Sequence, residues 1–299
     1  MGPFGRGGSA DSRYGQGGQR RGGVRWWVLL VFGAYLGYYY FSHRQDAAFT
    51  GRKQLLDASM DQEVALGLQS FEQILSESKL VRDPKIVQPI ETIARRLIDV
   101  GPRVEQALAR TKGIKVNTEW DKFEWAVAVI DSEQANAFCL PGGKMAVYTG
   151  ILPVAKTADA LAVVMGHEIA HALLRHGSER MAQQKLMQIG TVAAGLSTSD
   201  MDPGQRQMVM AALGVGATYG IMLPFSRDHE SEADYVGLML SAAACYNPEE
   251  SIGLWERMSA GGGQRPPEFM STHPSGSTRI SQLQGWMDEA RAMQAQFCK

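Results

Sequence analysis

Cysteine is scarce in this 299-residue sequence, which contains only Cys139, Cys245 and Cys298. Three widely separated cysteines are too few for a disulfide framework or a structural zinc knuckle, so both are excluded. Two arrangements remain open: one disulfide with a free thiol, in an oxidising compartment, or three thiols.

An excess of charge of one sign is also missing. The 30 Lys and Arg residues nearly balance the 31 Asp and Glu residues. Because binding to phosphate backbones requires a basic surface, this balance argues against DNA or RNA as a partner. The hydrophobic content of 44% and the charged content of 20% are typical of an ordinary globular protein.

Long apolar runs are rare, and the clearest one lies near the N-terminus. Residues 1–24 are rich in Gly and Arg and offer little to bury, which predicts a disordered tail. The sixteen residues from Trp26 to Phe41 then carry no charge. As a helix they would measure about 24 Å, slightly short of a hydrocarbon core of about 30 Å. Aromatic residues at both ends favour the headgroup regions, so we predict a transmembrane signal anchor at residues 25–42.

Two other interpretations of this segment are a cleaved signal peptide and a buried core helix. No convincing small-residue cleavage site precedes Asp46, and the run is apolar on every face, which argues against both. The arginines before the run favour a tail that stays inside, although Arg44, Arg52 and Lys53 on the far side oppose this orientation. We therefore predict a single-pass protein of the bacterial inner membrane, with the bulk of the chain in the periplasm.

The remaining chain predicts a mostly helical α+β fold with one small sheet. Helices are expected from Ser59, from Asp83-Pro84 to Gly101-Pro102, from about Thr157 to about Gly190, and near 226–244, 248–259 and 276–296. Strands are expected at Ile114–Thr118, Trp125–Ile130 and Lys144–Thr149, and a loop at 195–205. Residues 208–225 are apolar but contain three glycines and a proline, which favours a buried helix or an apolar surface element over a second span.

The sequence His167-Glu168-Ile169-Ala170-His171 carries the chemistry. Residues four apart lie one turn apart on one helix face, so His167 and His171 can direct two imidazole nitrogens at one zinc ion. Glu168 follows the first ligand and can act as general base on a water activated by the metal, hydrolysing a peptide bond. The surrounding helix is apolar, and two histidines and a glutamate buried there without a partner would be costly.

A third ligand is needed. Leu174 and Gly177 occupy the positions where a metzincin would carry Gly and His, so that class is excluded. His176 is expected to interact with the C-terminal dipole of the helix instead. Glu230 and Asp234 share a face of a later helix, so Glu230 can coordinate zinc while Asp234 orients a ligand histidine. Glu232, the alternative ligand, lies on the opposite face.

The chain resembles a family of zinc metallopeptidases that contains the CAAX prenyl endopeptidases, HtpX, the Oma-type proteases and the BepA- and LoiP-like proteases. Four segments occur in the family's order: His167–His171, Glu230–Asp234, Asn136–Gly143 and Ser271–Ser275. The resemblance covers roughly residues 50–298 and is nearest to the single-domain periplasmic and Oma-type members. It implies a zincin-like domain at 50–298, one zinc ion per chain, and Glu230 as the third ligand.

Two further elements are assigned roles. An extended segment ending in Pro-Gly-Gly can expose a strand edge to which substrate adds, so we predict substrate binding by Asn136, Ala137, Phe138, Cys139 and Leu140. A plain hairpin strand is the alternative.

In BepA-like relatives, the histidine matching His273 approaches the zinc. Here His273 is predicted either to cover the metal as a latch or to stabilise the oxyanion during catalysis.

Together these features predict a membrane-anchored zinc endopeptidase, with Glu168, Asp234 and His273 in its catalytic machinery. Its expected substrates are unfolded or misassembled envelope proteins. Two alternatives remain. One is a non-proteolytic or latched chaperone that uses the same cleft. The other is a protease of the mitochondrial inner membrane, for which the glycine-rich tail is a poor presequence. The sequence leaves the oligomeric state open.

Overall fold

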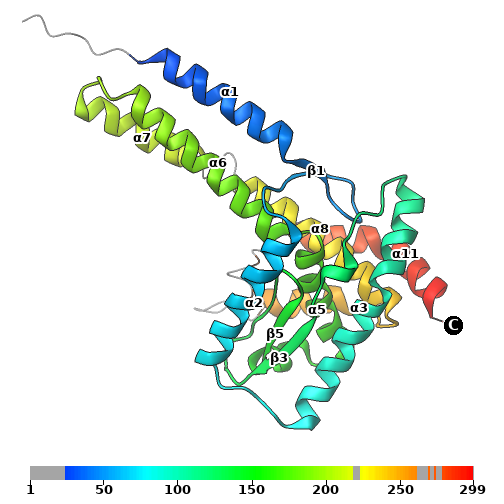
Figure 1. Ribbon diagram of the computed structural model, residues 1–299. Helices are drawn as coiled ribbons and strands as arrows, with labels where there is room; N and C mark the ends of the chain where they lie inside the picture. The colour runs from blue at the N-terminus through cyan, green and yellow to red at the C-terminus, as the bar shows by residue number, and fades with distance from the viewer. Residues whose placement is uncertain (1–23, 218–222, 261–268, 270–272, 274–277, 299) are drawn as a thin grey trace, which may run out of the picture.

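The computed structural model describes residues 24–217, 223–260, 269, 273 and 278–298 (Figure 1). The predicted tail at 1–24 lies almost wholly outside these residues. The predicted anchor at 25–42 forms helix α1, Trp26–Ser42. Within the described residues, no helix combines the length and the hydrophobicity needed to cross a membrane.

The molecule consists of a body and a projecting arm (Figure 1). The arm contains α1, α6 (His176–Ser197) and α7 (Pro203–Ala217), which lie side by side. Helix α8, Leu223–Ala243, leads from the arm back into the body. The predicted loop at 195–205 is therefore shorter than expected, because α6 reaches Ser197 and α7 begins at Pro203.

The body contains a three-stranded sheet in the order β3-β5-β4. Strand β3, Ala126–Ile130, is parallel to β5, Lys144–Tyr148, whereas β4, Ala137–Leu140, is antiparallel to β5. The strands predicted at 125–130 and 144–149 are confirmed. A separate antiparallel pair joins β1, Arg44–Asp46, to β2, Lys53–Leu55.

Helices make up most of the body, which confirms the mostly helical α+β class. They are α2 (Met60–Glu77), α3 (Pro84–Lys112), α4 (Leu152–Ala155), α5 (Ala158–Leu173), α8, α9 (Glu250–Ala260) and α11 (Arg279–Phe297), with short 3-10 turns at Trp120–Lys122 and Thr149–Ile151. Helix α2 begins with the predicted capping box, in which Ser59 and Gln62 bond reciprocally. A disulfide joins Cys245 to Cys298, and Cys139 is a free thiol.

The prediction that a helix ends at Gly101-Pro102 is wrong, because α3 continues to Lys112. Pro102 removes only one backbone donor. The row of buried side chains on α3 continues beyond Pro102 through Val104 and Leu108, and the packing of these side chains favours the uninterrupted helix.

The strand predicted at Ile114–Thr118 is also wrong, because this segment has no regular structure. Its backbone donors are satisfied by a side chain instead of a neighbouring strand. The fully buried carboxylate of Glu105 accepts hydrogen bonds from the backbone N–H groups of Asn117 and Thr118, both at 3.0 Å, and from Trp120 Nε1 at 2.7 Å.

The single helix predicted from Thr157 to Gly190 is broken in two. Helix α5 ends at Leu173, and α6 begins at His176 after Arg175, which has a φ of 57°. Arg175 donates hydrogen bonds to the buried carboxylate of Glu63, at 2.9 Å, and to the carbonyl of Ala58, at 2.8 Å. These contacts offset the cost of the left-handed backbone.

Helix α5 lies at the centre of the body and packs against α3, α8, α9 and β4. At its crossing with α8, Gly166 and Gly237 face each other. A Cβ atom on Gly237 would lie 2.7 Å from the backbone nitrogen of His167, and one on Gly166 would lie 2.8 Å from Ser241 Oγ. The two glycines therefore allow a close approach of these helices beside the predicted metal motif.

Candidate metal centre

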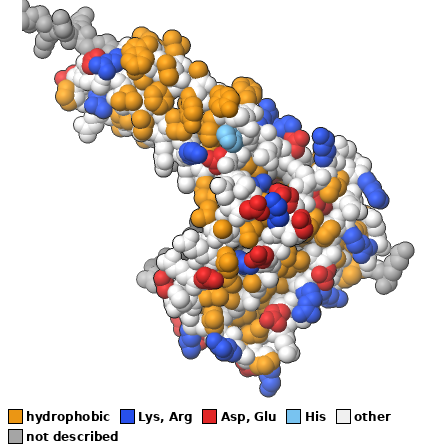
Figure 2. Space-filling view, viewed as in Figure 1, with side chains coloured by type: hydrophobic (Ala, Val, Ile, Leu, Met, Phe, Trp, Pro, Cys, Tyr) orange, Lys and Arg blue, Asp and Glu red, His pale blue; other side chains and the backbone are white. Residues whose placement is uncertain are grey.

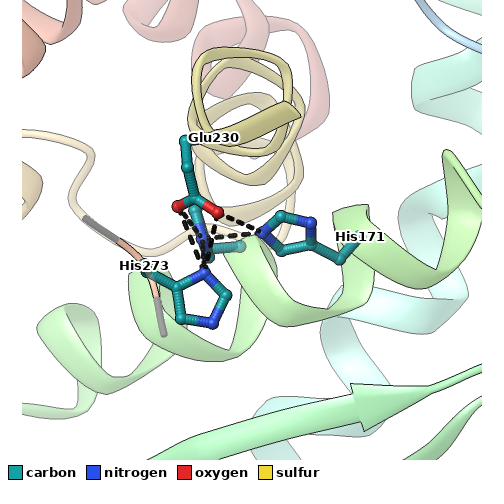
Figure 3. Close-up of side chains that lie close together, drawn as sticks. His171, Glu230 and His273 are labelled. Carbon is teal, nitrogen blue, oxygen red and sulfur yellow. Dashed lines mark hydrogen bonds and ion pairs between the residues drawn. The ribbon is translucent and has the colours of Figure 1, made fainter. Parts of the chain in front are cut away.

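The crossing of α5 and α8 brings the predicted motif residues together (Figure 3). His167 and His171 lie on α5, and Glu230 reaches them from α8. The Nε2 atoms of the two histidines are 3.0 Å apart. The Glu230 carboxylate lies 3.3 Å from His167 Nε2 and 3.5 Å from His171 Nε2.

His273 completes this group from the segment between α9 and α11. Its Nδ1 atom lies 3.0 and 3.1 Å from the two Glu230 oxygens and 3.2 Å from His167 Nε2. Ligand atoms of His167, His171, Glu230 and His273 all lie within 4.8 Å of one another. We call these four residues the donor cluster.

The donor cluster fits a zinc ion. With bonds of about 2.0–2.1 Å, neighbouring donors of a tetrahedral zinc lie about 3.3 Å apart. The separations of 3.0 to 3.5 Å in the cluster bracket that value. Two imidazole nitrogens and a carboxylate are also the ligands of a Glu-type zinc peptidase.

The pKa values of the two α5 histidines are shifted in opposite directions. Burial, together with the neighbouring His167, holds the pKa of His171 well below its usual range, so its imidazole is neutral and ready to bind a metal. Burial would also lower the pKa of His167, but Asp234 and Glu230 outweigh it and raise the pKa to about 9. Metal binding must therefore displace a proton from His167.

Asp234 lies where the sequence predicts an orienting carboxylate. Its Oδ1 accepts a hydrogen bond from His167 Nδ1 at 2.9 Å, which leaves Nε2 directed at the other donors.

The sequence did not predict Arg279, which is the next residue in this chain of contacts. Arg279, 4% exposed at the start of α11, donates to Asp234 at 2.6 Å and stacks on Trp255, 3.3 Å from the ring centroid. Its position just after the His273 segment was the available signal.

His176 does not have the predicted role. It opens α6 instead of closing α5, so it is not a C-terminal dipole partner. Its Nε2 lies 3.2 Å from the Glu232 carboxylate, and its Nδ1 lies 2.8 Å from His171 Nδ1. Because a carboxylate only accepts, His176 Nε2 carries a proton, and His171 Nδ1 donates to His176. His171 Nε2 is thereby left with a lone pair that faces the other three residues of the donor cluster.

Burial lowers the pKa of His176 to about 4, which agrees with the neutral tautomer. Glu232 accepts from Thr50 Oγ1 and from Arg52 Nε, each at 2.6 Å. Glu232 therefore holds the partner of His171 and makes none of the contacts of the donor cluster. Its position agrees with the expectation that Glu232 and Glu230 lie on opposite faces of the helix.

Glu168 lies beside the donor cluster and is 2% exposed. Its Oε1 lies 3.4 Å from His273 Nε2 and makes no hydrogen bond to any residue that the structure describes. Burial raises the pKa of Glu168 above its usual range. A desolvated carboxylate of this kind is a stronger base than an exposed one.

The predicted substrate segment forms β4 and the residue before it. Among the described strands, β4 lies at the edge of its sheet, with β5 on one side. It packs against α5, and burial and the nearby Glu168 carboxylate raise the pKa of the Cys139 thiol. The edge strand therefore runs close to Glu168.

The segment carrying His273 is joined to this edge. The backbone N–H of Phe269 donates to the carbonyl of Ala135 at 3.1 Å, and that of His273 donates to the carbonyl of Phe269 at 2.8 Å. Phe269 is fully buried, and its ring stacks on that of His273 at 4.6 Å. Phe269 thus links His273 to the chain just before β4, a contact that sequence reasoning missed.

The sequence model described as "Peptidase family M48" matches residues 102–287, which include the predicted ligands on both helices and His273. The chain belongs to peptidase family M48. Together with the donor cluster, this membership makes the protein a zinc metalloendopeptidase, as the two-histidine motif predicts.

Individual relatives agree with the family. The mitochondrial metalloendopeptidase OMA1 of Schizosaccharomyces pombe is 34% identical over 268 residues, covering 87% of this chain and 72% of the relative. The protein of the same name from Saccharomyces cerevisiae is 29% identical over 286 residues, covering 91% of this chain and 77% of the relative. The beta-barrel assembly-enhancing protease of Escherichia coli is 26% identical over 242 residues, covering 80% of this chain and 46% of the relative.

Proposed function

We propose that this M48 peptidase cleaves unfolded or misassembled proteins with Glu168 as the general base. The observation that carries the proposal is the buried Glu168 carboxylate, which has a raised pKa and lies beside the donor cluster. When bound, zinc supplies a Lewis acid that polarises the peptide carbonyl and acidifies water. Glu168 takes the proton of the attacking water and delivers it to the leaving nitrogen.

The other site residues hold this arrangement. His167, His171 and Glu230 are the proposed zinc ligands, and Asp234 fixes the tautomer of His167 through the 2.9 Å hydrogen bond. The contacts of Asp234 are with His167 and Arg279, so Asp234 is a positioning residue.

Substrate is proposed to add as a strand along Asn136, Ala137, Phe138, Cys139 and Leu140. The edge position of β4 and its packing against α5 support this role. Pairing through main-chain atoms tolerates many sequences, which suits unfolded proteins. The contact between Phe269 and Ala135 uses the carbonyl just before this edge, so an incoming strand would pass beside Phe269.

His273 is proposed to act as a latch. A catalytic zinc site has three protein ligands and an open position, whereas a site with four protein ligands is closed. The position of His273 Nδ1 within the donor cluster supports this role. The catalytic form then requires His273 to move away from Glu230. The alternative, in which His273 stabilises the oxyanion, also requires this movement.

A second candidate function follows from the same observation. If the latch stays closed, the protein holds clients along β4 without cleaving them, as a chaperone or assembly factor. The four-donor arrangement is what favours this candidate.

The proposed setting is envelope protein quality control at the bacterial inner membrane, with α1 as an anchor. The name of the Escherichia coli relative, which refers to β-barrel assembly, supports this setting. The mitochondrial names of the yeast relatives support the alternative of the mitochondrial inner membrane.

Cleavage of unfolded casein by the full chain tests the enzymatic proposal. Wild type is expected to cleave, a chelator to abolish cleavage, and Glu168→Gln to lower the rate by about 10²–10⁴-fold while zinc stays bound. Glu72→Gln, a change at an exposed carboxylate on α2, is the matched control and should keep full activity.

The outcomes separate the candidates. Cleavage that survives Glu168→Gln would rule out Glu168 as the base. His273→Ala is expected to cleave faster than wild type if His273 is a latch, and more slowly if it stabilises the oxyanion. If neither wild type nor His273→Ala cleaves any unfolded substrate, the holding function is favoured.

A further inference from the structure

The surface of the arm is unusually apolar. Figure 2 shows hydrophobic side chains gathered over α1, α6 and α7, with charged side chains at the tip and near the body. Large apolar side chains are exposed on all three helices: Leu30 by 74%, Val192 by 55%, Met208 by 68% and Val215 by 59%. An exposed apolar surface of this extent indicates an interaction site.

Charged residues are missing from the middle of the arm. No Asp, Glu, Lys or Arg occurs in residues 26–42 of α1, 186–199 of α6 and its C-terminal end, or 207–217 of α7. The uncharged lengths of α1 and α6 correspond to about 21–25 Å of helix. Because the three helices lie side by side, their uncharged lengths form one continuous belt.

Polar contacts bound the belt at both ends. At the tip, Arg25 pairs with Asp200 at 2.7 Å, and the backbone N–H of Arg25 donates to the carbonyl of Ser197 at 2.9 Å. At the base, the carboxylate of Asp57 accepts from Tyr39 at 2.5 Å and from Lys185 at 2.7 Å. These contacts also fix α1 against α6.

An apolar groove runs between α1 and the α6–α7 pair. It has a volume of about 910 Å³, and its walls include Leu36, Leu186 and Leu213. A groove that is uncharged and open along the arm can accept acyl chains, whereas a polar ligand would find few partners there.

No described helix of the arm is by itself long and apolar enough to cross a membrane. We propose that the three helices are embedded in a lipid bilayer as one unit, so that α6 and α7 contact lipid as well as α1. Charged groups lie at both ends and none between them, and aromatic residues lie near both ends of α1, as expected at two headgroup regions. The belt is a few ångströms shorter than a hydrocarbon core of about 30 Å, a mismatch that local thinning accommodates. All three elements are helices, so their backbone donors and acceptors are satisfied within the chain.

This inference deepens the membrane anchor of the proposed function, which involves α1 alone, and does not rest on any catalytic role. It also places the site. His176, the partner of His171, is the first residue of α6, and Lys185 at the base lies nine residues further on. His176 is then about 14 Å along the helix from Lys185 at the base of the belt, and the donor cluster lies beside His176 through His171. The favoured substrates are segments close to the membrane surface.

Quenching of tryptophan fluorescence by brominated lipid tests the proposal on the full chain. Leu213 on α7 and Leu66 on α2 are both 49% exposed, so Leu213→Trp and Leu66→Trp are matched variants. Each is reconstituted in phosphatidylcholine vesicles with or without bromine on the acyl chains, and the signal of wild type is subtracted. The added emission of Leu213→Trp is expected to be largely lost in brominated vesicles, and that of Leu66→Trp to be retained.

Equal retention of both added signals would overturn the proposal, because α7 would then lie outside the lipid. So would concentration-dependent dimerisation of the full chain with an unquenched Leu213→Trp, since a second copy would then cover the arm. Flotation gives an independent measurement. Leu30→Lys combined with Val31→Lys should still float with vesicles through α6 and α7, and adding Leu213→Glu should release the protein. Because neither readout requires cleavage, an inactive peptidase would not affect the result.

Discussion

At the scale of single residues, the two α5 histidines are oriented in parallel ways. Asp234 accepts from Nδ1 of His167, and the imidazole of His176 does the same for His171. In both cases the bond fixes the tautomer whose Nε2 lone pair faces the donor cluster. Glu232 and Arg279 in turn hold these two partners, so each histidine is supported by two successive contacts.

This parallel predicts the effect of His176→Ala. Loss of the acceptor for His171 Nδ1 frees the ring to rotate and to change tautomer, so zinc affinity is expected to fall by about 10–100-fold. Competition with a chromogenic chelator measures the affinity. His43→Ala is the control, because the hydrogen bonds of that side chain go to Tyr39 and Ser42. Unchanged zinc affinity in His176→Ala would contradict the orienting role.

The sequence predicted the part of the site that depends on local spacing. His167 and His171 share a face in any helix, whatever the rest of the chain does. Glu230 was expected as a ligand from its spacing to Asp234 and from the family resemblance, but no local rule shows how residue 230 comes next to residue 171. His176 was misinterpreted because the break at Arg175 depends on Glu63, a residue more than a hundred positions away.

At the scale of elements, the crossing of α5 and α8 decides whether the ligands meet. Gly166 and Gly237 lie at this crossing, and the backbone of one helix occupies the space where the other would carry a Cβ. A methyl group there must push the helices apart or shift them along their axes. Either movement displaces Glu230 relative to His167.

Gly237→Ala is therefore expected to destabilise the protein by about 1–3 kcal/mol or more and to weaken zinc binding at the same time. Gly285→Ala on α11 is the matched control, because a Cβ there meets no described atom within 4 Å. In that helix the change should be neutral or should stabilise by about 0.5–1 kcal/mol. Thermal unfolding in the presence and absence of zinc measures both effects. A harmless Gly237→Ala would show that the crossing tolerates separation.

The elements themselves were predictable where one pattern dominated. The capping box of α2 and the strands β3 and β5, predicted from β-branched and aromatic residues bounded by turn residues, follow from short stretches of sequence. The errors at 101–102 and 114–118 share one cause, which is long-range packing. The buried face of α3 continues beyond Pro102, and its Glu105 takes the backbone donors that a strand would have used.

At the scale of the whole molecule, one buried network ties the arm to the body. Arg52, just before β2, donates to Glu179 of α6 at 2.9 and 2.6 Å and to Glu232 of α8 at 2.6 Å. His229 of α8 also lies 2.9 Å from Glu179. The network therefore connects three segments and reaches His176 through Glu232.

The network predicts how stability depends on pH. Burial opposes ionisation of Glu179, but Arg52 and His229 outweigh it and lower the pKa from 4.5 to about 2. Between these values the unfolded chain binds a proton that the folded chain does not. Ionised Glu179 therefore contributes up to about 3 kcal/mol to the free energy of unfolding. This contribution is fully present above pH 4.5 and is lost as the pH falls towards 2.

Urea unfolding of wild type and Glu179→Gln at a series of pH values measures this contribution. The chain is kept metal-free with a chelator, so that loss of zinc in acid does not enter. The difference in unfolding free energy should be largest above about pH 4.5 and should shrink towards about pH 2, because the wild-type carboxylate becomes protonated there. Glu256→Gln, at an exposed position on α9, should show no such convergence. A difference that stays constant with pH would mean that Glu179 contributes through packing, and the ion pairs that connect the arm to the body would then add little to stability.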